Sequence, residues 1–290
     1  MRLARRALLL AGLGGLAAPA LARRLPPAGL PPLPPEIGVE DLGLEGVAIR
    51  LWRPANPGPQ SRALLFSHGA NAEARKYDEL TSAWAAEGHV VAAVTHREPA
   101  QGGQPDMAAA RAGWQRRLAD MRVAARHLAA VAPGRELVAA GHSYGALVAQ
   151  ALGGAEVLWE GDGGPLPMPG VARVVAFSPP GPLPGFIDAA GWARLAVPMF
   201  VQTGTADVVP PVAPSWEAHL ASFEAATVSP RWLWVGRGVD HYFGNMIGRP
   251  ERARDEAQAA LFQAAVAASL AFIEGRPPPE QPGDVTLTVR

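Results

Sequence analysis

The sequence Leu137-Val-Ala-Ala-Gly-His-Ser-Tyr-Gly-Ala-Leu-Val148 joins an apolar run to a helix-forming run through the pattern G-x-S-x-G. The apolar residues before Gly141 predict a buried strand, and the residues after Gly145 are good helix formers. A serine between them would stand on a sharp, strained turn with its hydroxyl exposed, because the flanking glycines let strand and helix approach closely. The stretch therefore predicts a strand, a tight turn at Ser143 and a helix.

The sequence around Ser143 is stronger evidence for a nucleophile than the G-x-S-x-G pattern alone. With 32 glycines among 290 residues, a G-x-S-x-G match is weak evidence alone. Here a strand-like run leads in and a helical run leads out, which is the context that a nucleophile elbow requires. A serine hydroxyl is a poor nucleophile unless a base removes its proton, so a base must be sought elsewhere in the chain.

Short apolar runs alternate with helical patterns along the sequence. Such alternation is typical of an α/β domain whose parallel sheet is covered by helices on both faces. Catalytic side chains are then expected at the carboxyl ends of the strands. We expect strands at residues 47–51, 63–66, 90–94, 136–140, 171–177, 199–203 and 232–235, the first at a sheet edge, and helices at residues 75–87, 107–131 and 252–274.

Composition excludes several kinds of site. The chain has no cysteine, which rules out disulfides, thiolate metal sites and a cysteine nucleophile. Its formal net charge is zero and its basic residues form no block, so no nucleic-acid partner is indicated. The sequence has no metalloprotease, Walker or dinucleotide-binding motif in a suitable context. We expect a small-molecule partner, no metal and no other cofactor, and leave the oligomeric state open.

The first 22 residues resemble an export signal. Arg2, Arg5 and Arg6 precede an uncharged run at residues 7–18 that is too short to span a bilayer, and an A-x-A pattern ends at Ala22. The adjacent Arg5 and Arg6 are typical of a twin-arginine signal. We expect a periplasmic or secreted protein with no membrane span after signal removal; an uncleaved membrane anchor is the alternative.

Proline-rich stretches set the expected domain limits. Residues 23–36 favour extended polyproline II and are expected to be a linker. We expect one α/β domain over residues 37–275, because its length and the 49% hydrophobic content of the chain suffice for one sizeable core. Residues 276–290, again rich in proline, are expected to be a C-terminal tail.

His241 is the candidate general base among the seven histidines. It follows Ser143 in the chain and lies in a loop just past the strand expected at residues 232–235. His127 and His219 fall inside helical patterns, and the histidines before the serine come in the wrong order for this architecture.

Asp207 is the first candidate for the carboxylate that must hold the tautomer of the base and stabilise its imidazolium. It lies in a turn that leaves the strand expected at residues 199–203, so both its order and its location fit. Asp188 is the second candidate and Asp162 a weaker one. Asp240 is too close to the base in sequence to orient its ring easily.

The loop after the strand expected at residues 63–66 is suited to bind an oxyanion. Its sequence Ser67-His-Gly-Ala-Asn71 can turn backbone N–H groups toward the nucleophile. The expected donors are the N–H groups of Ala70 and of Tyr144, the residue after the nucleophile. His68 either contacts the substrate or hydrogen-bonds the loop, and the sequence leaves both roles open.

Together these motifs resemble the α/β-hydrolase superfamily, and within it the branch of dienelactone hydrolase-like, chlorophyllase-like and platelet-activating-factor acetylhydrolase-like esterases. The resemblance implies the α/β-hydrolase fold, a mostly parallel sheet without a large cap domain, with nucleophile Ser143, acid Asp207, base His241 and oxyanion amides at Ala70 and Tyr144. It covers about residues 64–274 and rests on F-S-H-G at 66–69, W-A-A-E-G-H-V-V-A at 84–92, G-H-S-Y-G at 141–145, G-T-A-D at 204–207 and D-H at 240–241.

Two departures leave the subfamily open. Dienelactone hydrolases carry a cysteine where Ser143 stands, so that activity is not expected. The strand around Val91 ends in Val-Thr-His, where many relatives have an aspartate. Neither departure touches the expected catalytic set.

Two insertions, at residues 153–170 and 179–197, are candidates for the walls of a substrate site. Neither is long enough for a large helical cap. Their apolar and aromatic side chains suggest a shallow, partly open cleft with few charges, suited to uncharged esters with short to medium acyl chains. We expect substrate contacts from His68, Trp159, Trp216, Tyr242 and Phe243.

These patterns favour a serine esterase that acts through an acyl-enzyme. Two alternatives stay open: acyl transfer to an alcohol or amine through the same intermediate, and a non-catalytic binding protein on this fold. The presence of Ser143, Asp207 and His241 in the expected order argues against the binding protein.

Overall fold

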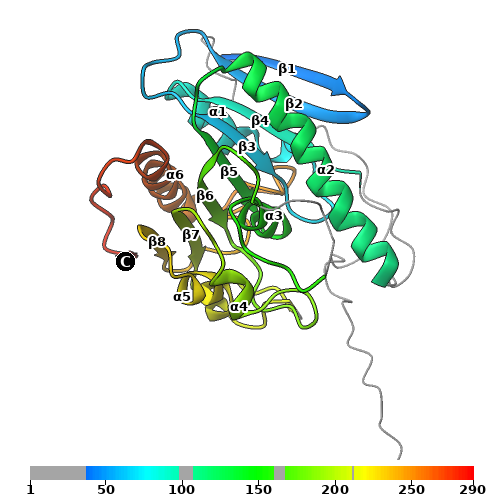
Figure 1. Cartoon of the computed structure of the whole chain (residues 1–290). Helices are drawn as coiled ribbons and strands as arrows, with labels where there is room; N and C mark the ends of the chain where they lie inside the picture. The colour runs from blue at the N-terminus through cyan, green and yellow to red at the C-terminus, as the bar shows by residue number, and fades with distance from the viewer. Residues whose placement is uncertain (1–36, 98–106, 160–166, 211) are drawn as a thin grey trace, which may run out of the picture.

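The computed structural model describes residues 37–97, 107–159, 167–210 and 212–290, and Figure 1 shows their arrangement. The expected export signal and proline-rich linker, residues 1–36, lie outside the described residues. Asp162, the weakest candidate acid, does so too.

A single mixed sheet runs through the described part of the chain, in the strand order β1-β2-β4-β3-β5-β6-β7-β8-β9. The strands from β4 to β8 are parallel, whereas β1, β2 and β9 join antiparallel. Helices cover both faces, which is why β3 and β7 are buried throughout. The strands are β1 Ile37–Leu44, β2 Val47–Pro54, β3 Ala63–Ser67, β4 Val90–Thr95, β5 Leu137–His142, β6 Val171–Phe177, β7 Met199–Gly204, β8 Arg231–Gly236 and β9 Val285–Val289.

Helices pack against both faces of this sheet (Figure 1). One core includes Trp114 of α2, Leu147 of α3 and Trp192 of α4; the other includes Trp84 of α1 and Phe262 of α6. The helices are α1 Asp78–Ala86, α2 Met107–Val131, α3 Tyr144–Leu152, α4 Ala189–Trp192, α5 Ala221–Ala225 and α6 Ala259–Glu274, with 3₁₀ turns η1 Ala74–Tyr77, η2 Trp216–Leu220 and η3 Glu256–Gln258.

The expected α/β class is confirmed. Both limits of each predicted strand lie within three residues of the observed limits. The helix predicted over residues 107–131 is α2. The helix expected at residues 75–87 is a 3₁₀ turn followed by α1, and the one expected at 252–274 begins only with η3. The carboxyl ends of β3, β5, β7 and β8 lead into the loops that carry the candidate site residues.

The sheet has an antiparallel strand at each edge that the sequence patterns did not predict. β1 forms a hairpin with β2 through Glu45 and Gly46, both at positive φ, so β2 is not the edge strand that was expected. At the other edge β9 pairs with β8. The expected domain end at residue 275 is therefore wrong, because the supposed tail adds a strand to the sheet and Gln281 Oε1 accepts from the Trp234 indole N–H at 2.9 Å.

The α6 segment is apolar enough to resemble a membrane span. Residues 256–274 meet the length and hydropathy criteria for one, but 56% of the apolar window is buried inside the structure. Phe262, Ala265, Ala268 and Phe272 pack in the core beneath the sheet. This is the pattern of a core helix.

Removing β9 should destabilise the whole domain. We expect a chain that ends at Gly275 to lose roughly 2–4 kcal/mol of unfolding free energy, because each ladder hydrogen bond lost from β8 is worth about 1 kcal/mol and the β8 edge becomes exposed. Urea denaturation of the two chains measures the difference. An unchanged midpoint would mean that residues 276–290 are a dispensable tail.

Candidate active site

Ser143 stands on the sharp turn between β5 and α3. Its φ of 54° lies in the left-handed region, with ψ at −120°, a costly conformation for a residue with a side chain. Its N–H donates to the Phe177 carbonyl of β6 at 2.9 Å. A side chain at Gly145 would collide with the Ser67 backbone, and one at Gly141 with the Gly145 backbone. The turn therefore depends on both glycines of the motif.

Asp207 and His241 are brought together from the loops after β7 and β8. His241 Nδ1 lies 2.8 Å from Asp207 Oδ1, and the Thr203 hydroxyl donates to Oδ2 at 2.8 Å. Burial raises the pKa of Asp207, but the charges and hydrogen bonds of His241 and His219 outweigh it and hold the pKa well below its usual value. An ionised Asp207 requires the His241 proton on Nδ1, which leaves Nε2 available as a base.

Main-chain contacts tie the acid turn to the base loop. The Ala206 N–H donates to the Val239 carbonyl at 3.1 Å. Gly204 lies so close to Val239 that a Cβ at this position would collide. Within the base loop, Asp240 Oδ1 accepts from the Tyr242 N–H at 2.8 Å. The backbone therefore sets the separation of acid and base.

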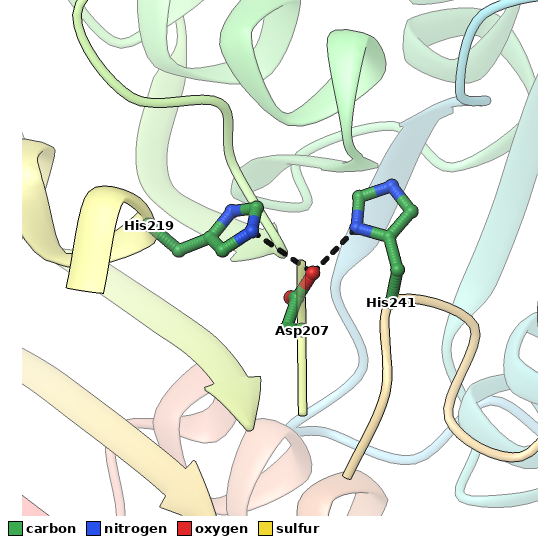
Figure 2. Close-up of side chains that lie close together, drawn as sticks. All are labelled: Asp207, His219 and His241. Atoms are coloured by element: carbon green, nitrogen blue, oxygen red, sulfur yellow. Dashed lines mark hydrogen bonds and ion pairs between the residues drawn. The ribbon is translucent and has the colours of Figure 1, made fainter. Parts of the chain in front are cut away.

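A second histidine contacts the same carboxylate, as Figure 2 shows. His219 of η2 places Nε2 2.9 Å from Asp207 Oδ1, and its Nδ1 lies 2.7 Å from the Pro179 carbonyl oxygen. Burial lowers the pKa of His219, but the interactions with Asp207 and Pro179 raise it above its ordinary value. In the sequence His219 falls inside a helical pattern, and its contact with Asp207 was not predicted because no local signal relates η2 to the ends of β6 and β7.

The three side chains of this cluster also form a group of potential metal ligands, with donor atoms within 4.8 Å of one another. Both imidazole nitrogens approach one carboxylate oxygen, at 2.8 and 2.9 Å. These are hydrogen-bond and ion-pair distances, which protons on the two rings explain. A metal on both rings would displace those protons, so the arrangement favours acid–base chemistry.

Tyr77 and His142 connect the oxyanion loop, the elbow and the base loop. The Gly69 N–H donates to Tyr77 Oη at 3.0 Å, Tyr77 Oη lies 2.9 Å from His142 Nδ1, and His142 Nε2 lies 2.7 Å from the His241 carbonyl oxygen. A carbonyl only accepts, so His142 carries its proton on Nε2 and Nδ1 accepts from the Tyr77 hydroxyl. Burial holds the pKa of His142 well below its ordinary value, which keeps the ring neutral as this chain of hydrogen bonds requires.

A buried polar network holds the oxyanion loop from its other side. Arg117 donates to the His68 carbonyl at 2.7 Å and to the Gly69 carbonyl at 3.2 Å. His68 Nδ1 lies 2.6 Å from the Gly69 carbonyl oxygen, and its Nε2 accepts from the His96 N–H at 2.9 Å. His68 is fully buried. Of its two expected roles, the structure supports the loop-bonding one, and the expected substrate contact is wrong because both ring nitrogens are engaged.

The candidate nucleophile lies beside the oxyanion loop, and its neighbour His142 lies beside the base. A Cβ at Gly69 would lie 3.5 Å from the Cβ of Ser143, and the following Ala70 is half-buried, as is Tyr144. His142, next to Ser143, packs its ring 4.7 Å from the His241 ring. Among the interactions of the described residues there is no hydrogen bond from Ser143 to His241. Such bonds often tighten only when substrate binds.

Phe243 lies inside the protein and not on a cleft wall. Its side chain has no exposed surface and packs 5.6 Å from the Phe177 ring and 6.1 Å from the Trp234 ring. The expected substrate contact at Phe243 is therefore wrong, because the base loop turns this side chain inward. Tyr242 is half-buried and its ring stands edge-on to that of His241 at 5.0 Å.

The two insertions expected to form walls pack on each other. Trp159 is 7% exposed and its ring lies 4.4 Å from the Phe186 ring, while the Leu158 N–H donates to the Phe186 carbonyl at 2.7 Å. Phe186 also contacts Trp114 of α2 at 4.9 Å. Trp216, at the start of η2, is half-buried. No large cap domain occurs among the residues that the structure describes.

One family model matches part of the chain. The model described as serine aminopeptidase, S33, matches residues 58–158, which contain the oxyanion loop and the elbow but neither Asp207 nor His241. A comparison with curated proteins finds no match.

Several solved structures share the fold of this chain. TT1662 from Thermus thermophilus has a TM-score of 0.55 at 21% identity, covering 82% of this chain and 97% of its own. A protein assigned as a dienelactone hydrolase from Klebsiella pneumoniae has a TM-score of 0.56 at 16% identity, covering 81% and 98%. A cold-adapted esterase from an Arctic intertidal metagenomic library has a TM-score of 0.51 at 15% identity, covering 82% and 92%. At these identities the likeness concerns the fold.

The Tyr77 hydroxyl should be important for both stability and activity. We expect Tyr77→Phe to lower the free energy of unfolding by roughly 1–3 kcal/mol, because it leaves the Gly69 N–H and His142 Nδ1 buried without partners, and to lower kcat. Urea denaturation and steady-state kinetics measure the two effects. Tyr242→Phe, which removes a hydroxyl from a half-buried ring, should cost much less stability. Equal costs would contradict a special role for Tyr77.

Proposed function

We propose that this chain, a member of the α/β-hydrolase superfamily, is a serine hydrolase that cleaves carboxylic esters through an acyl-enzyme. The observation that carries the proposal is the buried hydrogen bond between His241 Nδ1 and Asp207 Oδ1 at 2.8 Å, formed beside a serine whose backbone is held at φ 54°. A carboxylate that orients an imidazole next to an exposed hydroxyl is the arrangement that activates serine.

In the proposed reaction Ser143 Oγ attacks the ester carbonyl while His241 Nε2 takes the hydroxyl proton. The protonated His241 then gives this proton to the leaving alcohol, and the acyl group remains on Ser143. A water molecule, deprotonated by the same imidazole, attacks the acyl-enzyme and releases the acid. Asp207 keeps the imidazole in its Nδ1–H form and stabilises its cation.

The low pKa of Asp207 fits this role. Burial raises that pKa, but the opposing contacts with His241 and His219 hold it well below its usual value, so the carboxylate stays charged at neutral pH. A charged acid next to His241 stabilises the imidazolium that forms at each proton transfer. The Thr203 hydroxyl, 2.8 Å from Oδ2, fixes the orientation of the carboxylate.

The N–H groups of Ala70 and Tyr144 are proposed to bind the oxyanion. This proposal is supported by the hydrogen bonds and the helix start that fix the two segments carrying these N–H groups. Gly69 is held through its N–H by Tyr77 and through its carbonyl by Arg117, and Tyr144 opens α3 directly after the elbow. Donors that are fixed before the reaction lose little energy to reorganisation when charge develops.

The proposed substrate is an uncharged ester with a short to medium acyl chain. Apolar side chains of the two insertions, among them Trp159 and Phe186, pack together. Phe186 contacts Trp114, whose ring lies 5.9 Å from that of Tyr144, and we propose that Tyr242 and Trp216 complete the wall. Acyl transfer through the same intermediate is the alternative reaction, and cleavage of amides is a second one because the matching family model is described as an aminopeptidase. We also propose that the protein is exported, on the basis of its first 22 residues.

The nucleophile assignment can be tested by covalent labelling. A fluorophosphonate probe should label Ser143, and Ser143→Ala should keep the fold, abolish labelling and lower kcat by at least about 10³-fold. Mass spectrometry locates the label and circular dichroism checks the fold. A folded wild-type protein that is not labelled would favour a binding protein, and hydrolysis at nearly the normal rate in the variant would place the nucleophile elsewhere.

The acid assignment has a matched control in the chain. Asp207→Asn should fold but lose kcat severely, by roughly 10³–10⁴-fold, because an amide cannot hold the productive tautomer of His241 or stabilise its cation. Asp188→Asn should retain most activity, because the Asp188 carboxylate accepts from the Gly191 N–H at 3.1 Å as the cap of α4. The reverse ranking of the two kcat values would move the acid to Asp188.

Substrate size can be tested with p-nitrophenyl esters of increasing acyl length. We expect kcat/KM to peak at short to medium chains, because each added methylene gains about 0.8 kcal/mol only where apolar wall remains to bury it. Aminoacyl p-nitroanilides should be cleaved much more slowly than the best ester. A steady rise through palmitate or a jump above the critical micelle concentration would indicate a lidded lipase site, and a preference for the anilides would indicate a peptidase.

A further inference from the structure

His219 contacts Asp207 in the same cluster as His241, but the reaction proposed above does not use His219. It is 1% exposed, and Figure 2 shows its ring directed at Asp207 from the side opposite His241. Its Nε2 lies 2.9 Å from Asp207 Oδ1, the oxygen that also accepts from His241. Asp207 thus receives one imidazole on each side.

The hydrogen-bond partners of His219 limit its protonation states. Nδ1 lies 2.7 Å from the Pro179 carbonyl oxygen, which can only accept, so Nδ1 carries a proton. A neutral ring would then present the lone pair of Nε2 to a carboxylate oxygen at 2.9 Å, which is repulsive. Nε2 is buried and, among the described residues, has no other hydrogen-bond partner besides this carboxylate oxygen. The contact is therefore an ion pair that requires a second proton on the ring.

The groups around His219 support a cation at this position. The titratable side chains that face it are Asp207 after β7, His241 after β8 and His142 at the end of β5. Of these, Asp207 is held ionised, since its pKa lies well below its usual value, and His142 is held neutral by burial. On its own element, η2, the acidic Glu217 is exposed. The buried Asp207 carboxylate is therefore the anion that a protonated His219 would balance.

We propose that His219 is a positioning residue of the site: as an imidazolium at neutral pH it shares the Asp207 carboxylate with His241 and weakens the attraction of that carboxylate for the proton of the base. The catalytic part of this inference rests on the proposed function, whereas the protonation state of His219 does not. Because His219 already neutralises part of the Asp207 charge, the carboxylate stabilises an imidazolium at His241 less than a lone carboxylate would. The charge of His219 therefore affects the proton transfer between Ser143 and the base.

The protonation of His219 can be measured without reference to activity. We propose ¹⁵N NMR of the imidazole nitrogens in the full chain at pH 7, with the His219 signals identified by their loss in His219→Gln. Two protonated nitrogens in the His219 ring are the expected result. A neutral ring protonated only on Nδ1 would overturn the proposal. The protonation state is read from the wild-type spectrum, and through-bond correlation of the ring nitrogens with the assigned His219 backbone identifies these signals where the variant folds poorly.

The effect on the base appears in the pH dependence of kcat/KM on a p-nitrophenyl ester. Glutamine at position 219 keeps a neutral N–H donor but removes the charge, so His219→Gln should move the acid limb of the profile to higher pH by roughly one unit. His127→Gln, which changes a histidine of α2 away from the cluster, should leave the limb in place. A fall in kcat at all pH values without a shift of the limb would mean that His219 is merely structural and would overturn the proposal.

The two proposals fail in different ways. If wild-type Ser143 is neither labelled by a fluorophosphonate nor able to hydrolyse esters, the proposed function fails while the NMR result on His219 still stands. If labelling and hydrolysis are normal but the acid limb of His219→Gln coincides with that of the wild type, only the positioning role of His219 fails.

Discussion

The buried charge of Asp207 is the constraint on which the carboxyl edge of the sheet depends. A carboxylate with no exposed surface is costly unless hydrogen bonds and opposite charge compensate for lost hydration. Here the compensating groups are the Thr203 hydroxyl and the imidazoles of His219 and His241. They come from the end of β7, from η2 and from the loop after β8, so satisfying one anion requires three separate segments to meet. Displacing any of the three leaves part of the charge unpaired.

The polar groups around this anion divide into a charged pair and a neutral chain. Asp207 and His219 form the ion pair, whereas Tyr77 and His142 pass hydrogen bonds from Gly69 to the His241 backbone without carrying charge. Burial keeps the His142 ring neutral by lowering its pKa. A second cation close to His241 would make it harder for the base to accept a proton, so a neutral connector can orient the base loop without that cost.

Backbone strain and close packing bring the serine to the same edge. Ser143 is held at positive φ between β5 and α3, and the elbow can pass beside Ser67 only because Gly145 has no side chain. Such strain persists only where the surrounding structure determines it strongly. The central position of β5 in the sheet and the Ser143 hydrogen bond to the Phe177 carbonyl provide this support. Contacts with the sheet therefore hold Ser143 in its strained backbone conformation.

Patterns that are local in the chain predicted the framework of this protein well. The period of apolar residues located α2 and the parallel strands, because a strand or helix buried on a known face must repeat at its own spacing. The same patterns predicted the elbow at Ser143 and singled out Asp207 and His241, since turns that leave parallel strands converge at one edge. The Asp207–His241 contact was expected from chain order, and the 2.8 Å separation of the two side chains agrees with it.

Features that depend on contacts between distant segments were decided only by the tertiary structure. His219 looked like a helix residue because nothing near it in sequence reveals that η2 packs over the end of β7, where its ring meets Asp207. Phe243 was expected on a cleft wall, but the base loop places its side chain in the core. Residues 285–289 were expected to be part of a tail, but they pair with β8 as a strand. By itself, then, the sequence determined the order of elements and the residue types at each strand end, because these follow from spacing and propensity. Which side chains share a proton, and which are buried, was decided by packing between segments far apart in the chain, where no local period applies.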